Sequence, residues 1–409
     1  MSYTIAGIDI HKKVLMVVVT DAAGEELEFA SRRFGTTASE RQHVVAWLQE
    51  RQVQEVVMES TAQYWKPVWL DLEAHFGKLH LAQAHSNRAP KGRKHDFADA
   101  RRLTRRLIAG ELVLSFVPDA EQRTWRTMTR GKVQLVRDRV RLQNQLEALL
   151  EEMRIKLSSI VSELLGLSGR RILRALAEGE NDPVQLAKLG DFRLRCNKEE
   201  LADALRGHLE PMHREMLSLF LERLELLDKQ ILQLDRMAAK AMKQYEEAVI
   251  RLAEVPGFGP DSAQQLIAEV GPKATSFDSA AQFSSWAGTC PGSEESAEHN
   301  HSARSPKGNT FLRRILTQAA QAAVRKKGSH FQIMFRRWLP RLGYNRAIWA
   351  IAHKLCRLVW KVLHDGLHYI EHGQQSTPKA NRQRAQKMIQ ALRTMGYTVA
   401  ISSLTPDPA

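Results

Sequence analysis

Four acidic residues near the start of the chain have the types and spacing needed for metal-dependent chemistry. Asp9 interrupts the apolar stretch AGIDI, and Glu59 follows the apolar residues VVM. Asp96 and Asp99 stand three positions apart in KHDFADARRL, so a helix over 96–109 would place both on one face. An aspartate buried in a strand is costly unless a cation or hydrogen bonds compensate for it.

Together, these carboxylates predict a binding site for two Mg²⁺ ions about 4 Å apart on either side of a phosphate. Oxygen ligands favour Mg²⁺ over zinc. Each residue alone has an ordinary alternative, since Asp96 could cap a helix and Glu59 could lie on the surface. The set is more informative than its members.

A second candidate lies in the polar segment 288–309, GTCPGSEESAEHNHSARSPKGN, between two stretches with helical spacing. The segment is long and polar for a simple connector, although most loops of this composition are only flexible links. Ser296 within it is a candidate nucleophile, and the basic residues Arg304 and Lys307 follow. Composition alone does not single out this serine.

The charge of the chain indicates a polyanionic partner. Its 409 residues include 60 Lys and Arg against 46 Asp and Glu, a formal net charge of +14. This favours binding to nucleic-acid backbones, the alternative being a generally basic soluble protein. Predicted nucleic-acid contacts next to the carboxylates are Lys91, Arg93, Lys94, Arg101, Arg102 and Arg105, and those next to the polar segment are Arg304 and Lys307.

A tight turn is predicted at 256–260, PGFGP, between two helices. Gly257 and Gly259 would expose backbone N–H groups at a helix N-terminus, which can hold a phosphate without sequence preference. Ser262 could cap the following helix. Turns of this kind are common, so the helix-hairpin-helix-like motif is only moderately specific.

The elements that must position the carboxylates form an α/β region. Residues 3–10 and 14–20 are rich in β-branched residues and predict a hairpin, followed by a strand at 25–34. Helices are predicted at 39–51, 64–76 and 96–109, and strands at 53–59 and 78–84. This order predicts a mixed sheet covered by helices.

The middle of the chain predicts long helices. An apolar heptad pattern predicts a coiled coil, either as an antiparallel hairpin within one chain or as a dimer contact between chains. The seam comprises Leu217, Phe220, Leu224, Leu227, Ile231, Leu234, Ala238 and Ala241, and a shorter run with the same rhythm comprises Leu142, Leu146, Leu149 and Met153.

We therefore predict an α/β plus α protein with four parts. These are a catalytic domain at 1–115, a helical region at 116–248 with a small insertion at 159–210, a mainly helical domain at 249–372, and a polar tail at 373–409. No apolar stretch is long enough to span a membrane. The three cysteines lack the spacing of a zinc site or a disulfide framework, so a cytoplasmic location is expected.

The order of five motifs resembles that of a known family. GIDIHKK, VVMESTAQYW, KHDFADARRL, VPGFGP and WAGTCPGSEESAEHNHSARSPKGNTFLRRIL follow one another as in the DEDD transposases of insertion-sequence family one hundred and ten, eleven-eleven subgroup, which are related to Piv-type DNA invertases. The resemblance covers about 1–110 and 249–330. It implies a RuvC-like (RNase H-like) N-terminal domain and a C-terminal transposase domain.

The resemblance also implies roles and partners. The DEDD tetrad maps onto Asp9, Glu59, Asp96 and Asp99, and the nucleophilic serine maps onto Ser296, which Ala297 follows as in that subgroup. Such proteins are guided by a noncoding (bridge) RNA that pairs with donor and target DNA. They form dimers that assemble into tetramers, with the two halves of one active site supplied by different subunits. Association with the nucleoid is expected when the protein acts.

These features predict a recombinase that moves an insertion sequence through a covalent phosphoserine intermediate. The alternative is a RuvC-like, Mg²⁺-dependent DNA-junction endonuclease that uses water as the nucleophile. A non-catalytic nucleic-acid-binding protein would leave the four carboxylates unexplained. A covalent protein–DNA adduct distinguishes the recombinase from both alternatives.

Overall fold

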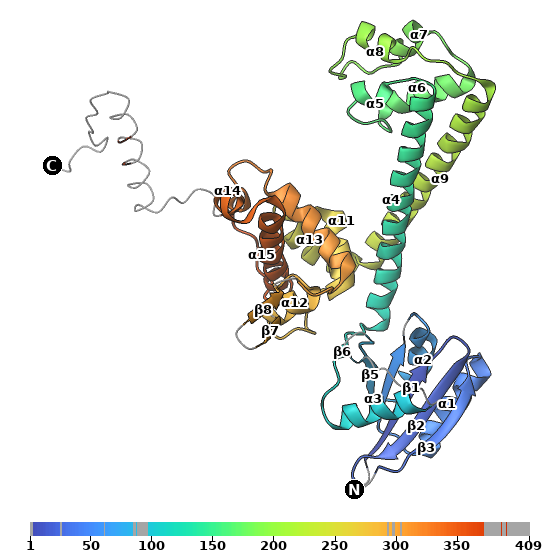
Figure 1. Ribbon diagram of the computed structural model, residues 1–409, viewed down its shortest axis with the longest axis vertical. Helices are drawn as coiled ribbons and strands as arrows, with labels where there is room; N and C mark the ends of the chain where they lie inside the picture. Colours follow the sequence, from blue (N-terminus) through green and yellow to red (C-terminus); the bar gives the residue numbers. More distant parts are fainter. Residues whose placement is uncertain are drawn as a thin grey trace, which may run out of the picture. The chain divides into compact units, whose positions relative to one another are not determined.

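The computed structural model of the chain describes residues 3–24, 27–60, 62–84, 87, 97–292, 294–296, 299–302, 305–371, 386 and 390. The chain divides into two compact units, Met1–Pro118 and Asp119–Ala409 (Figure 1). No helix within the described residues is long and apolar enough to cross a membrane. The predicted tail at 373–409 lies outside the described residues, apart from Gln386 and Gln390.

The first unit contains a six-stranded sheet of order β3-β2-β1-β4-β5-β6. Its strands β1 to β3 form an antiparallel meander, β4 and β5 run parallel to β1, and β6 is antiparallel to β5. The mixed sheet predicted from the sequence is therefore confirmed. The strands are β1 (Thr4–Ile10), β2 (Val14–Asp21), β3 (Ala30–Gly35), β4 (Glu55–Ser60), β5 (Lys78–Ala82) and β6 (Leu114–Ser115).

Helices cover both faces of this sheet (Figure 1). Ile8 and Met58 belong to the large apolar cluster that also contains residues of α1 (Ala38–Glu50) and α2 (Trp65–Leu72). The opposite face is covered by α3 (Ala98–Ile108), whose Leu103 packs with Val57. Three predicted elements begin two or more residues later than expected: β3 at Ala30 rather than 25, β4 at Glu55 rather than 53, and α3 at Ala98 rather than 96.

The second unit begins with a helical hairpin. Helix α4 (Ala120–Glu152), capped by Asp119, packs against α9 (Pro211–Ala241). Two ion pairs join the helices, Lys132 with Asp235 and Arg139 with Asp228. The position moves forward by seven residues along α4 and back by seven along α9, so the helices are antiparallel. The two helices therefore pair within one chain, as in the first of the two arrangements left open by the sequence, and a contact between chains stays a prediction. A supercoiled geometry stays a prediction.

A small helical cap joins the two long helices at the predicted insertion. It contains α5 (Leu157–Ile160), α6 (Leu167–Glu178), α7 (Pro183–Lys188) and α8 (Lys198–Ala204). Leu173 and Leu201 of the cap share one apolar core with Leu146 and Leu217 of the hairpin. The cap is thus fixed to the end of the hairpin by burial of apolar side chains.

The remainder of the second unit is mostly helical, as predicted. The helices are η1 (Lys243–Tyr245), α10 (Glu246–Ala253), α11 (Pro260–Val270), α12 (Ala280–Ala287), α13 (Thr310–Ala323), α14 (His330–Leu342) and α15 (Tyr344–His364). Helix α15 is the central element: it packs against α10, α12, α13 and α14. A short hairpin, β7 (Glu294–Ser296) and β8 (His299–Ser302), lies between α12 and α13.

Candidate functional site

Asp9 and Glu59 are brought together by the register of the central strands. They are direct partners in the parallel pair of β1 and β4. Gly7 lies two residues before Asp9 and is therefore on the same face of the sheet. A Cβ atom at Gly7 would lie 2.5 Å from the carbonyl oxygen of Ala100. The missing side chain thus lets α3 approach β1 closely, which places the first turn of α3, with Asp99, over this face of the sheet.

Arg102 lies one turn after Asp99 and joins the carboxylates from the two elements. Its Nη2 is 3.3 Å from Asp99 Oδ1 and 3.9 Å from Glu59 Oε2. Its Nη1 donates to the carbonyl oxygen of Asn87. Arg102 was predicted to contact nucleic acid, and the structure places it in the acidic site. Nucleic-acid contact by Arg102 stays a prediction.

The surroundings of Glu59 disfavour its charged form. Burial raises its pKa, the Arg102 charge acts in the opposite direction, and the nearby carboxylates of Asp9 and Asp99 raise it further. Its Oε2 is buried and has no hydrogen-bond partner among the described residues. A cation beside Glu59 would supply that missing partner and relieve the repulsion.

The chemical type of the ligands suits a hard divalent cation, because Asp9, Glu59 and Asp99 offer only oxygen atoms. No group of three His, Cys, Asp or Glu side chains in the described part of the chain is arranged to hold a metal ion. Arg102 supplies the positive charge between Glu59 and Asp99 in this arrangement. Asp96, the fourth predicted ligand, lies outside the described residues.

His11 is a neighbour of the site that sequence reasoning missed. Its Nε2 is 3.0 Å from Asp9 Oδ2, and its side chain is 58% exposed. The only available signal was its position two residues after Asp9 in GIDIHKK. A polar residue at the end of a strand has many ordinary explanations, so this signal does not identify it.

Two predicted basic contacts lie on the outer side of α3. Arg101 and Arg105 both stack on the ring of Phe29, with their guanidinium carbons 5.6 and 5.3 Å from its centroid. Arg101 also donates to Ser31 Oγ at 3.2 Å. The contacts predicted for Lys91, Arg93 and Lys94 lie outside the described residues.

The predicted turn in the second unit joins α10 to α11. Gly257 has φ +96°, and a Cβ atom there would lie 2.1 Å from the carbonyl oxygen of Ala319. Close packing on α13 thus accounts for this glycine. Gly259 itself is the N-cap of α11, and its N–H donates to Ser262 Oγ at 2.8 Å, so Ser262 contributes to the cap from the first turn of the helix rather than as the N-cap residue. Phosphate binding by the two glycines stays a prediction.

Ser296 ends strand β7 and is the register partner of His299 in β8. The structure thus places the candidate nucleophile on a short two-stranded hairpin rather than in an irregular loop. Arg304 lies outside the described residues, whereas Lys307 is exposed beyond the hairpin.

The base of this hairpin is closed by two glycines. Gly288 ends α12 with φ +73°, and Gly308 precedes α13 with φ +50°. A Cβ atom on Gly288 would lie 2.8 Å from the Cα of Gly308, and one on Gly308 would lie 2.3 Å from the carbonyl oxygen of Ala287. The two chain segments can meet this closely only because both residues lack a side chain.

Arg313 holds both segments of the base from α13. Its Nη1 donates to the carbonyl oxygens of Gly288 and Pro306, the latter at 2.6 Å. Its guanidinium carbon lies 4.4 Å from the ring centroid of Trp349, whose Nε1 donates to Ser305 Oγ at 2.9 Å. We call Gly288, Gly308, Arg313 and Trp349 the hairpin clamp.

A buried ion network fixes the next part of the chain. Glu269 on α11 is 1% exposed and accepts two 2.8 Å hydrogen bonds from Arg130 of α4. Asn309, which caps α13, donates to Glu269 at 2.7 Å, and Arg126 lies 3.5 Å away. Burial alone would raise the pKa of Glu269, but the hydrogen bond from Arg130, both arginine charges and the hydrogen bond from Asn309 lower it.

The network and most of the clamp were not predicted from the sequence. Asn309 after a glycine is a recognisable helix-start signal. Arg313, Trp349 and Glu269 carry no such signal, because each has a partner 25 or more residues away.

Comparison with known families covers both candidate regions. Residues 6–155 match the DEDD transposases of the IS110 family, and residues 250–335 match transposases of the IS116/IS110/IS902 family. The first match spans Asp9, Glu59 and Asp99, and the second spans Ser296 and three of the four clamp residues, ending before Trp349. Together, the matches define a DNA transposase.

Two relatives of the chain are also named as transposases. The chain is 29% identical to a probable family 20 transposase of Pseudomonas aeruginosa (strain PAO1) over 67% of its length and 73% of the relative's. It is 25% identical to a candidate transposase, y4pF/y4sB, of Sinorhizobium fredii (strain NGR234), over 74% of its length and 71% of the relative's. The chain belongs to the IS110 family of transposases.

Proposed function

We propose that this transposase cuts and rejoins DNA with a RuvC-like, Mg²⁺-binding carboxylate site and a serine nucleophile. The observation that carries the proposal is the acidic site itself, in which Asp9 and Glu59 are register partners and Asp99 faces them from α3. The strand order, an antiparallel meander followed by parallel strands, supports the RuvC-like assignment.

Asp9, Glu59, Asp96 and Asp99 would hold the metal, in the two-ion arrangement predicted from the carboxylates in the sequence. When bound, Mg²⁺ supplies positive charge that offsets the charge gathering on the attacked phosphate. Arg102 would then have to give up part of its contact with Glu59 or Asp99. The carboxylates would hold this positive charge beside the scissile phosphate, and Arg102 would keep their mutual repulsion low before DNA binds.

Ser296 would attack the scissile phosphorus. A bond forms between its Oγ and phosphorus, the bond from phosphorus to the 3′ oxygen breaks, Ser296 loses its hydroxyl proton, and the departing oxygen becomes a 3′-OH. The phosphoserine ester conserves the phosphodiester energy, so a 3′-OH from another strand can reverse the step and join the strands without hydrolysis. The hairpin clamp would hold the backbone of Ser296 in place.

The proposal extends to partners. A bridge RNA of the same element would choose donor and target DNA by base pairing, with the protein contacting backbone. Dimers assembling into tetramers would bring a carboxylate site and a serine from different chains together.

The test is capture of the DNA adduct. Wild-type protein with Mg²⁺, bridge RNA and nicked donor DNA should become linked to DNA through the peptide containing Ser296, identified by mass spectrometry. Ser296→Ala should form no adduct, whereas the control Ser302→Ala in the neighbouring strand should form it. Cleavage by Ser296→Ala at the wild-type rate would leave water as the nucleophile and favour the endonuclease.

A further inference from the structure

A basic groove of about 610 Å³ lies between α4, α11 and α13. Four cationic side chains line it, together with the single carboxylate of Asp261. The cations are Lys132, Arg137, Arg141 and Arg314. Neither the candidate carboxylate site nor the hairpin clamp includes any of these residues.

Two of the four cations are already neutralised, and two are not. Lys132 bonds to Asp235 and Asp261, and Arg141 bonds to Asp138. The ion pairs of the described part of the chain include neither Arg137 nor Arg314.

Arg314 bonds only to neutral side chains, at 2.5 Å to Gln265 Oε1 and 3.2 Å to Gln318 Oε1, and its buried Nε has no hydrogen-bond partner among the described residues. Burial and the like charge of Arg137 lower the pKa of Arg314, with Asp261 acting against them. The groove therefore has positive charge that an anion would stabilise.

The floor of the groove is apolar. Val136 and Val140 lie one helical turn apart on α4 and are 40% and 51% exposed. Such a surface fits the C–H faces of a deoxyribose. A ribose would place its 2′-hydroxyl beside valine, which offers that hydroxyl no hydrogen bond, so these side chains favour deoxyribose.

We propose that this groove binds the sugar–phosphate backbone of DNA, with Arg137 and Arg314 contacting phosphates and the two valines contacting the sugars between them. The assignment rests on the proposed function in one respect, that DNA is the substrate. It adds the surface of the second unit that holds the DNA.

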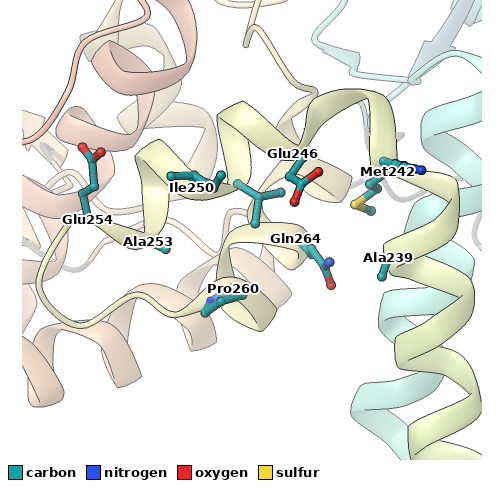
Figure 2. A pocket seen from close by; sticks show the side chains of 10 residues that line it. Ala239, Met242, Glu246, Ile250, Ala253, Glu254, Pro260 and Gln264 are labelled. Carbon is teal, nitrogen blue, oxygen red and sulfur yellow. The ribbon is translucent and has the colours of Figure 1, made fainter.

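A second hollow, of about 670 Å³, borders the same helix and provides a contrast. Pro260 and Gln264 line it, next to the groove residues Asp261 and Gln265 in sequence. Its charged residues are Lys243, Glu246 and Glu254, so carboxylates outnumber cations (Figure 2). A phosphate would be repelled there, which makes this hollow the natural control site.

The test is the salt dependence of DNA binding, measured on Ser296→Ala protein without divalent metal and with a short random-sequence duplex. Each lost phosphate contact should reduce the slope of log affinity against log salt by about 0.9. The double variant Arg137→Gln/Arg314→Gln should therefore lower the slope by about 1.8. The control Arg236→Gln/Lys243→Gln removes the same net charge outside the groove, from the exposed Arg236 on α9 and from Lys243 of the second hollow, and should leave the slope unchanged.

Folding and ligand class are checked in the same titrations. Arg314→Lys, which keeps the charge, should retain the slope, and the melting temperature of each variant shows whether the fold persists. An RNA duplex of the same sequence should lose less affinity than DNA in the Arg137→Gln/Arg314→Gln variant. An unchanged DNA slope, an equal loss in the control pair, or a larger loss for RNA would each overturn the proposal.

The salt-dependence test of the groove and the adduct test of the serine mechanism can fail independently. A lowered slope without any Ser296 adduct in the otherwise wild-type protein would leave the groove standing and refute the serine mechanism. An adduct together with an unchanged slope would refute the groove alone.

Discussion

The carboxylate site and the serine hairpin are positioned by opposite means. Asp9 and Glu59 lie on neighbouring strands in the middle of a sheet, and their proximity follows from backbone register. Ser296 lies on a two-stranded hairpin, whose base is closed by the side chain of Arg313 and by two glycines. The first arrangement is set by regular secondary structure, and the second by a few long-range side-chain contacts.

This difference has an energetic consequence. Removing a carboxylate leaves the sheet intact and relieves repulsion, so its effect should be on chemistry. Removing a clamp residue withdraws hydrogen bonds from backbone groups and should loosen the hairpin. The following predictions test this contrast, beginning with the largest effect.

Asp9→Asn or Glu59→Gln should reduce DNA cleavage at least about 10³-fold, because several kcal/mol of charge stabilisation at the phosphate would be lost. The measurement is the single-turnover cleavage rate in Mg²⁺. The control is Glu55→Gln on the same strand, whose carboxylate bonds to Tyr3 and His80 instead. Equal rates for wild-type protein in EDTA and in Mg²⁺ would rule out the metal site.

Arg313→Ala should lower the rate of adduct formation by about 10²-fold, because a small displacement of a nucleophile costs this much. The exposed Arg325, two residues after the end of the same helix, provides the control variant, Arg325→Ala. Arg313→Lys should recover part of the rate, since a lysine can still donate to a carbonyl oxygen. DNA affinity should stay at the wild-type value, and wild-type adduct rates in Arg313→Ala would show that the clamp does not position Ser296.

Glu269→Gln should destabilise the second unit by about 3–5 kcal/mol, because it leaves Arg126 and Arg130 without their buried counter-charge. The pKa of Glu269 is lowered in the folded state. Its stabilising contribution is therefore present above the pKa of an unfolded glutamate and is lost as pH falls through the folded value. Denaturant titrations at neutral and acidic pH measure this, and a variant as stable as the wild type at neutral pH would contradict it.

The smallest expected effect is that of Glu59→Gln on stability rather than on cleavage. Without divalent metal at neutral pH, the melting temperature of this variant should rise by about 2–4 °C. The pKa of Glu59 is raised in the folded state, so its charged form costs stability above that pKa, and the difference from wild type should vanish as pH falls below the pKa of an unfolded glutamate. Glu55→Gln is again the control and should lower the melting temperature. A Glu59→Gln protein that melts below the wild type would mean that Arg102 outweighs the repulsion.

The same contrast explains how much the sequence could predict. Strands of β-branched residues and the placement of acids within them were enough to predict the sheet and one shared site for Asp9 and Glu59, whereas their direct pairing came from the register of β1 and β4. The long helices were also predicted, but the choice between pairing within and between chains required the Lys132–Asp235 and Arg139–Asp228 contacts.

Arg102 shows where sequence reasoning fails. In a run of basic residues it is indistinguishable from its neighbours, yet its place one turn after Asp99 directs it to the carboxylates rather than outward. Arg313 shows the same limit, because its partners Gly288 and Pro306 become neighbours only once α12 and α13 have both packed against α15. Local patterns predict elements, whereas side-chain contacts between distant segments depend on the fold.

The most direct test of the central claim, that the carboxylates and Ser296 serve one reaction, is adduct formation by two inactive variants mixed together. Asp9→Asn and Ser296→Ala proteins are assayed separately and as a mixture, with bridge RNA, donor DNA and Mg²⁺. The account predicts no adduct from either protein alone and a partial return of adduct in the mixture, carried by Ser296 of the Asp9→Asn chain. An adduct from Asp9→Asn protein alone at the wild-type rate would contradict it, because the serine would then act without the carboxylate site.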